Sequence, residues 1–309
     1  MTLATLLMAV APTVFSPGVV SSAAHDSAPA FSPDSRTIYF GRSSGTVSFI
    51  LTTHRQGTGW SAPQIAPFSG VWTDMEPAMA PDGSYLIFVS NRPTVAGDEP
   101  LDGMINGEPQ PRRGANLWRV RRTPSGWSTP ERLPDIVNST PSTYAPSIAA
   151  NGNLYFMRPD ATTHKFRLFV AEFRDDTYRE PTPLPFSHGD VSDVDPAVLP
   201  DESAIVFGSG RQRRKDIDLF VAFRKDGGWS EPIYLGDTIN GPTSDAEPRW
   251  DRDLHTLYFS SERLEPVPTP IPAGAAATAL RDLSGWNNGQ YNIWSVDLGE
   301  VLRTGHLPL

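Results

Sequence analysis

The sequence predicts an all-β fold, a β-propeller with five four-stranded blades, and three observations support this prediction. The chain of 309 residues contains 31 Pro and 25 Gly, a composition that favours many turns over long helices. A pattern of short apolar runs joined by turns recurs five times along the chain. The repeats are about 50 residues long, which is the length that a four-stranded blade needs.

Each repeat has the same order of parts. An acidic residue and a Pro come first, followed by an apolar run, a turn, a second apolar run and an Arg. A third apolar run follows, and in four repeats a Gly–Trp pair or Tyr178 opens a fourth. Runs bounded by Pro, Asp, Gly and Asn are typical of strands joined by tight turns. The anchoring prolines are Pro29, Pro77, Pro146, Pro196 and Pro248.

The blades follow from this order. We predict them near 26–73, 74–142, 143–192, 193–244 and 245–298, with insertions at 93–113 and 264–290. Nothing after Leu298 resembles a fourth strand for the last blade. Residues 11–19 resemble 66–71, the end of the fourth strand in an internal repeat. We therefore expect an N-terminal strand near 6–22 to complete the last blade, so that residues 1–309 form one propeller domain. Six blades remain an alternative if more residues precede Met1.

One phrase of the repeat resembles a known family. Glu76–Arg92 reads EPAMAPDGSYLIFVSNR and is similar to the PD40 (WD40-like, TolB-type) β-propeller repeat. Repeat three departs from the pattern, because Asn151-Gly152 replaces Pro-Asp-Gly and Thr143 replaces Asp. The resemblance implies a propeller of the kind found in periplasmic partner-binding proteins, in serine peptidases and in other exported proteins. It says little about chemistry, because function resides in sites and not in the fold.

Composition excludes several classes of function. The net charge of −9 argues against a nucleic-acid partner, which would need a basic face. The absence of Cys excludes disulfides, thiolate nucleophiles and Cys-bound zinc. The apolar segment 3–11 is too short to span a membrane and has no preceding Lys or Arg. It is consistent with a leader of a periplasmic or secreted protein, or with an edge strand at residues 1–12 of a cytoplasmic one.

The order of strands in a blade predicts which segments share a face. The turns between the first and second strands lie on one face, and the connections between the second and third strands lie on the other. Both insertions, the repeat-initial acids and the strand-end arginines fall on the second face. The candidate ligand-binding residues are Asp74, Glu76, Arg92, Tyr144, Arg158, Asp193, Asp195, Arg211, Asp245, Glu247, Arg263 and Trp286.

Two interpretations of the repeated acids stay open. An Asp and an Arg that recur in each blade are typical of a structural pair or a turn cap. Alternatively, Glu76, Asp195 and Glu247 form a carboxylate ring at the mouth of the central channel, where Ca²⁺ is one cation that they could bind. We expect this ring to be incomplete, because Tyr144 replaces the acid in repeat three and Ala28 replaces it in repeat one.

The predicted function is ligand or partner binding on the insertion-bearing face. The expected partner is a protein, a peptide or a carbohydrate, and the expected state is a monomer without a resident cofactor. Trp286, with Asn287 and Asn288, either contacts the ligand or holds its loop against the propeller. The alternative is a glycoside hydrolase-like enzyme that uses the channel-mouth carboxylates. No residue is assigned a catalytic role.

Overall fold

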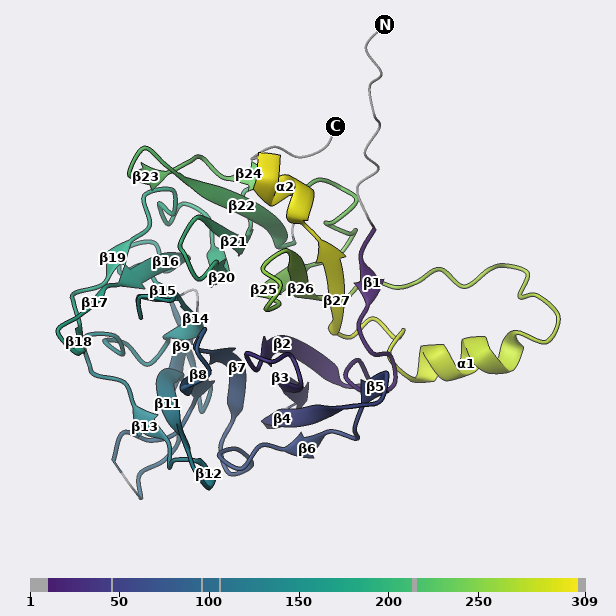
Figure 1. Ribbon diagram of the computed structural model, residues 1–309, viewed down its shortest axis with the longest axis horizontal. Helices are drawn as coiled ribbons and strands as arrows, with labels where there is room; N and C mark the ends of the chain where they lie inside the picture. Colours follow the sequence, from purple (N-terminus) through teal and green to yellow (C-terminus); the bar gives the residue numbers. More distant parts are fainter. Residues whose placement is uncertain (1–10, 46, 96, 106, 213–215, 305–309) are drawn as a thin grey trace, which may run out of the picture.

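The protein is a five-bladed β-propeller (Figure 1). The computed structural model describes residues 11–45, 47–95, 97–105, 107–212 and 216–304. Five sheets of four or five strands stand around a central axis, and two short hairpins lie outside them. This arrangement confirms the fold class that the sequence predicts.

The first three blades follow one plan, with the strands in chain order from the channel outward. The first contains β2 (His25–Phe31), β3 (Thr37–Ser44), β4 (Val47–Gln56), β5 (Gly59–Trp60) and β6 (Gln64–Ile65). The second contains β7 (Asp74–Met79), β8 (Tyr85–Ser90), β11 (Asn116–Thr123), β12 (Gly126–Trp127) and β13 (Glu131–Arg132). The third contains β14 (Tyr144–Ile148), β15 (Leu154–Pro159), β16 (Phe166–Ala171) and β19 (Thr182–Pro183), beside a hairpin of β17 (Phe173–Arg174) and β18 (Thr177–Tyr178).

The last two blades complete the circle. The fourth contains β20 (Asp193–Val198), β21 (Ala204–Ser209), β22 (Asp218–Lys225), β23 (Gly228–Trp229) and β24 (Ile233–Tyr234). The fifth contains β25 (Asp245–Trp250), β26 (Thr256–Ser261) and β27 (Asn292–Asp297), and its outermost strand is β1 (Thr13–Val14). The other elements are the hairpin of β9 (Gly103–Ile105) and β10 (Glu108–Gln110), and the helices α1 (Ala276–Ser284) and α2 (Gly299–Thr304).

The outermost strand of a blade is split in two. In the first blade, β5 pairs with the end of β4 at Arg55 and Gln56, whereas β6 pairs further back, at Leu51 and Thr52. Pro63 lies between the two short strands and cannot donate to the ladder. The predicted fourth strand is therefore present, but the Pro after the Gly–Trp pair interrupts it.

The N-terminal strand closes the ring. In β1, Thr13 and Val14 pair antiparallel with β27, opposite Ser295 and Trp294. The backbone N–H of Phe15 extends this ladder by donating to the carbonyl of Ile293 at 2.7 Å. This pairing confirms the predicted closure. The part of the predicted closing strand before residue 11, with most of the apolar segment 3–11, lies outside the described residues.

Aromatic side chains join neighbouring blades. Trp127 of the second blade stands edge-on to Tyr39 of the first, and its Nε1 donates to the Tyr39 hydroxyl at 3.0 Å. Trp229 of the fourth blade makes the same type of edge contact with Tyr155 of the third. Edge-to-face pairs of this kind add to the burial of apolar area. The repeated tryptophans therefore pack one blade against the next.

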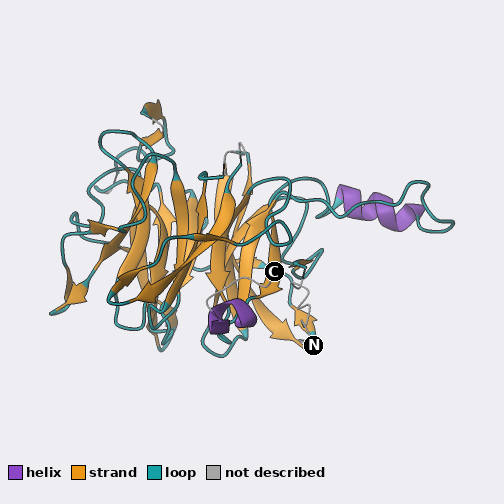
Figure 2. Cartoon of the chain, turned by 90° about the horizontal axis from the view of Figure 1, so that it is seen from above, coloured by secondary structure: helices purple, strands orange, loops and turns teal. Residues whose placement is uncertain are grey.

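The two helices lie outside the blades. Helix α2 follows β27 and buries Val301 against the fifth blade. Helix α1 lies in the insertion at 264–290, which projects sideways from the rim of the ring (Figure 2). Within the described ranges, neither helix has the length and apolar character to cross a membrane.

Candidate functional site

Four blades contain a buried ion pair at the start of their innermost strand. In each, the first acid of the repeat is fully buried and contacts the Arg at the end of the second strand. The pairs are Asp26–Arg42 at 2.5 Å, Asp74–Arg92 at 3.2 Å, Asp193–Arg211 at 2.7 Å and Asp245–Arg263 at 2.7 Å. Each Arg also donates to a backbone carbonyl of the preceding connection, as Arg92 does to Phe68. The pairs thus tie each blade to the segment before it, which is a structural role.

The third blade lacks this pair because Thr143 stands in place of Asp. Its arginine, Arg158, donates instead to the hydroxyl of Ser139 at 2.6 Å. The guanidinium lies over the ring of Phe169, at 4.2 Å from the ring centre. A hydroxyl and an aromatic ring therefore position Arg158.

The second acid of the repeat lies at a bulge in the innermost strand. At this position the strand register shifts and the residue adopts a positive φ of about 50° in all five blades. The five ring residues are Ala28, Glu76, Ala145, Asp195 and Glu247. Each directly precedes the anchoring Pro, which has no N–H and is tolerated in a central strand at such a bulge. Non-glycine residues at positive φ persist only where their surroundings hold them, so this ring is a built feature.

The structure corrects one assignment in this ring. The sequence interpretation placed Tyr144 at the acid position of repeat three, but Ala145 is the residue with positive φ before Pro146. Tyr144 lies one residue earlier, and its hydroxyl donates to the carbonyl of Arg113 at 2.8 Å. Tyr144 thereby holds the end of the 93–113 insertion.

The ring carboxylates link neighbouring blades through hydrogen bonds. The carboxylate of Glu76 accepts from the N–H of Ala145 at 2.6 Å, and that of Asp195 accepts from the N–H of Glu247 at 3.2 Å. Glu247 accepts from the hydroxyl of Ser260 at 2.7 Å, and this hydroxyl accepts from the N–H of Ala28. Carboxylates therefore join the second blade to the third, the fourth to the fifth, and the fifth to the first.

One buried arginine lies near these carboxylates. Arg249, two residues after Glu247, is 6% exposed and lowers the pKa of both Glu76 and Asp195 by its charge. Burial and mutual repulsion outweigh this effect, and they raise the pKa of Glu76 to about 8 and that of Asp195 to about 7. No three His, Asp or Glu side chains of the described residues are grouped so that they could hold a metal ion.

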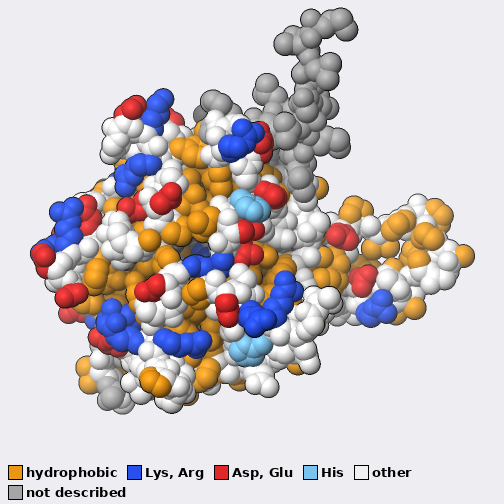
Figure 3. Space-filling model, in the orientation of Figure 1, with side chains coloured by type: hydrophobic (Ala, Val, Ile, Leu, Met, Phe, Trp, Pro, Cys, Tyr) orange, Lys and Arg blue, Asp and Glu red, His pale blue; other side chains and the backbone are white. Residues whose placement is uncertain are grey.

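Arg249 also forms part of a pocket on the face that carries the turns between first and second strands, here called the turn face. The space-filling view shows a central hollow there, with basic side chains at its floor and hydrophobic ones around it (Figure 3). The hollow is partly open to solvent. All five innermost strands or their turns contribute to its wall.

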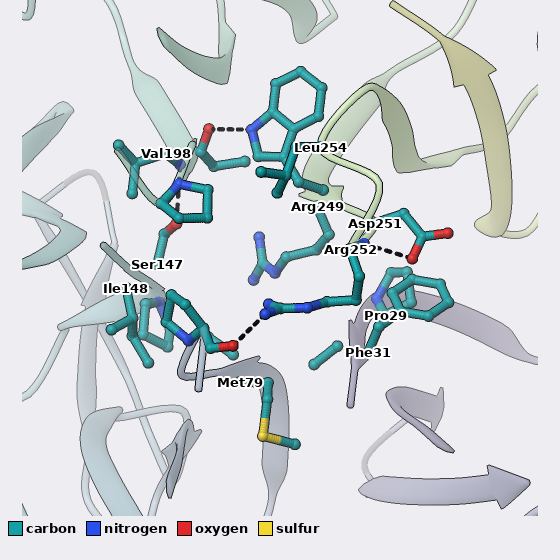
Figure 4. Close-up of a pocket in the computed structure, with 17 residues that line it drawn as sticks. Pro29, Phe31, Met79, Ser147, Ile148, Val198, Arg249, Asp251, Arg252 and Leu254 are labelled. Carbon is teal, nitrogen blue, oxygen red and sulfur yellow. Dashed lines mark hydrogen bonds between the residues drawn. The ribbon is translucent and has the colours of Figure 1, made fainter. Parts of the chain in front are cut away.

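The close-up shows two guanidinium groups near the centre of this turn-face pocket (Figure 4). Nη1 of Arg249 donates to the carbonyl of Pro248 at 2.7 Å. Arg252 crosses the opening from the fifth blade and donates to the carbonyl of Pro81 in the second. Apolar side chains make up most of the remaining wall.

Sequence reasoning missed both pocket arginines, although the repeat contains a signal for them. The position of Arg249 is occupied by Ala30, Ala78 and Ala197 in three other repeats and by a Ser in repeat three. Arg252 stands where three repeats have the Pro of the turn. A residue that departs from a structural repeat does not serve the repeat itself. The two arginines of repeat five are therefore the sequence signal for the pocket.

The predicted contact residue Trp286 lies at the base of the 264–290 insertion. Its ring stands edge-on to Trp294 at 6.1 Å between ring centres. The neighbouring Asn287 is buried and makes two backbone hydrogen bonds with Glu265, which close the insertion at its base. Asn288 donates to the carbonyl of Ala23. In the structure these three residues hold the insertion to the propeller.

Comparisons with known proteins show the fold alone. No protein-family model matches the chain, and no curated protein matches its sequence. Among solved structures, a thermostable family-43 glycoside hydrolase is 10% identical with a TM-score of 0.55, over 80% of this chain and 86% of that one. A TolB-type protein from Agrobacterium tumefaciens is 17% identical with a TM-score of 0.48, over 77% and 70%. TolB from Acinetobacter baumannii is 16% identical with a TM-score of 0.45, over 74% and 46%. The class of protein that the fold defines is a β-propeller.

Proposed function

We propose that this chain is a TolB-like, non-enzymatic binding propeller that recognises a protein partner through its insertion-bearing face. The observation that carries the proposal is the arm, residues 264–290. Its helix α1 buries none of its residues against the ring. Leu280 and Leu283 are 67% and 47% exposed, and their spacing places them on one side of the helix. An unpartnered apolar helix face of this kind suits the apolar groove of another protein.

The base of the arm supports a docking role. The side chain of Asn287 forms two hydrogen bonds, of 2.8 and 2.9 Å, with the backbone of Glu265. Trp286 packs edge-on against Trp294. The arm is therefore fixed to the propeller at its base, while its apolar helix extends away from the rim (Figure 2). A fixed base limits the freedom that the arm would lose on binding, which favours affinity.

The test compares partner capture by the wild type and by an arm variant. In the double variant Leu280→Glu and Leu283→Glu, the partner should be recovered from a lysate of the source cells at least about tenfold less, because two charges enter an apolar contact. Its free energy of unfolding should change by less than about 0.5 kcal/mol, since both side chains are exposed. Ile65→Glu is the matched control, because Ile65 is 53% exposed on the outer strand β6. Equal recovery with all three proteins contradicts the proposal.

The PD40 identity of the repeats and a periplasmic or secreted location belong to the same proposal. Both are supported by the similarity of Glu76–Arg92 to that repeat. Fractionation of the source cells, with the protein found only in the cytoplasm, would contradict the location.

One observation favours a second candidate, a glycoside hydrolase-like enzyme. The carboxylates of Glu76, Asp195 and Glu247 come from three blades, and two of them have a pKa near neutrality, as a general acid requires. Against this, the ring carboxylates are engaged in hydrogen bonds between blades. Release of nitrophenol from aryl glycosides by the wild type but not by Glu247→Gln would support the enzyme.

A further inference from the structure

We propose that the turn-face pocket binds the carboxylate of a small acid with an apolar tail, through the edge of the Arg249 guanidinium that carries Nε and Nη2. This pocket lies on the face opposite to the insertions, so the inference goes beyond the proposed partner site. It does not depend on the arm.

Arg249 has two buried N–H groups without an acceptor in the described part of the chain. Arg249 is only 6% exposed, and its Nη1 donates to the carbonyl of Pro248. Among the described residues, none accepts a hydrogen bond from Nε or Nη2. These two N–H groups form one side of the guanidinium, and their parallel geometry matches the two oxygens of a carboxylate. A buried charged donor without an acceptor is unfavourable, so the edge favours an anionic ligand.

The side chain of Arg249 is directed towards the centre of the pocket. Arg249 reaches into the pocket from β25, and Ser147 lines the opposite side (Figure 4). The hydroxyl of Ser147 accepts from the N–H of Val198 at 3.0 Å, which leaves its own proton to donate. Arg249 and Ser147 are therefore two side chains of the pocket wall that have hydrogen-bond donors to offer an anionic group.

The apolar side chains of the pocket wall select the rest of the ligand. The side chains around the arginine are largely apolar: Phe31, Met79, Ile148, Val198, Trp250 and Leu254 line the pocket. A highly polar molecule such as a sugar phosphate would leave its hydroxyls without partners against this wall. An aliphatic or aromatic chain would instead gain from burial. The chemistry therefore indicates a monocarboxylate with an apolar tail.

The carboxylates near Arg249 make binding depend on pH. Glu76, Asp195 and Glu247 compete with a bound anion for the positive charge, and Asp251, Arg252, Tyr144 and Tyr291 are further titratable groups facing them or the pocket. Because Glu76 and Asp195 hold their protons to near-neutral pH, the guanidinium is only partly compensated there. An anion at Arg249 favours the protonated forms further, so binding takes up protons. Affinity should rise as the pH falls from about 8.5 to about 6.

The test uses calorimetry with four probes on the wild-type chain: octanoate, octylamine, octan-1-ol and acetate. Octanoate should bind, with an affinity at least about tenfold above that of each other probe, because only it combines the charge with the tail. Equal affinities for octanoate and octan-1-ol, or no binding of octanoate, overturn the proposal. This comparison needs no variant, so it holds even where a substitution impairs folding.

Variants then locate the site. Arg249→Gln should weaken octanoate binding at least about tenfold, and Arg249→Lys should restore part of it as a charge without the two-nitrogen edge. Arg158→Gln is the matched control, because Arg158 lies at the end of β15 that faces the insertions. Unchanged binding by Arg249→Gln with intact circular dichroism overturns the assignment.

A further comparison distinguishes a small acid from the C-terminus of a peptide, because both offer a carboxylate next to an apolar group. A peptide with a free C-terminal Leu carries the same carboxylate and apolar group as a small acid, and its C-terminal amide lacks the charge. Binding of octanoate without binding of the peptide supports the small acid. Binding of the peptide without binding of octanoate overturns it. The arm variant Leu280→Glu with Leu283→Glu should bind octanoate like the wild type, which distinguishes a failure here from a failure of the partner site.

Discussion

Replacing Phe15 with Ala should weaken the seam at which the ring closes. Phe15 follows β1 and packs edge-on against Phe31, Trp60 and Tyr258, with ring centres 6.3, 6.1 and 4.9 Å away. A fully buried Phe→Ala change costs about 3–5 kcal/mol. Because Phe15 is only half-buried, we expect the free energy of unfolding to fall by about 2–3 kcal/mol.

The assay is urea denaturation followed by tryptophan fluorescence, with size-exclusion chromatography beside it. A loosened β1 would expose the edge of β27, so the variant should also self-associate more readily. Ile65→Ala on the outer strand β6 serves as the control and should change stability by less than about 0.5 kcal/mol. A Phe15→Ala variant that is as stable as this control would refute the conclusion that residues 13–15 hold the ring closed.

Two further predictions concern the acids. Asp74→Asn should lower the free energy of unfolding by about 3–5 kcal/mol, because it leaves Arg92 buried without its ion pair. Arg158→Gln should lower it by about 1 kcal/mol or less, because the partner of Arg158 is an aromatic ring instead of a buried acid. Urea denaturation measures both changes. The raised pKa of Glu76 means that the folded state holds the proton longer than the unfolded state. Its contribution to stability is therefore greatest below the ordinary pKa and is lost as the pH rises towards 8. Glu76→Gln removes this loss, so its stability relative to wild type should rise by up to about 1 kcal/mol per pH unit between pH 5 and 8.

Each of these predictions has a clear contrary outcome. Equal costs for Asp74→Asn and Arg158→Gln would show that the buried pair does not hold the blade. A stability difference between Glu76→Gln and wild type that stays constant from pH 5 to 8 would show that the pKa of Glu76 is not raised by folding.

Much of the fold could be predicted because each strand is bounded by its own local signals. Pro, Asp and Gly mark the turns, and repetition shows which turns are equivalent. The closing strand could also be predicted, since residues 11–19 resemble the end of a fourth strand. Helix α1 was missed, because an argument from total Pro and Gly content averages over the chain. The local run Ala276–Ser284 consists largely of good helix formers.

The candidate site was harder to predict because it depends on contacts between blades. Glu76 and Ala145 form a hydrogen bond although they are 69 residues apart in the chain. The sequence shows an acid before the Pro in three repeats, but not that these acids join blades. Arg249 is not among the predicted site residues, because it follows the Pro, whereas the prediction rests on the acids before the Pro, the strand-end arginines and the insertions. Its position, where three other repeats have Ala, is informative only after the five innermost strands are placed around one channel.

The pairing of β1 with β27 means that the ring can close only after nearly the whole chain has been synthesised. Ser21 and Ile293 exchange hydrogen bonds across 272 residues, so the segment around β1 has no docking place until nearly all of the later chain has emerged from the ribosome. At about 5–20 residues per second, that wait lasts roughly 14–54 s. Throughout this time the first four sheets can form while β1 lacks its partner β27, so this unpaired strand is the part of the chain that a chaperone would shield.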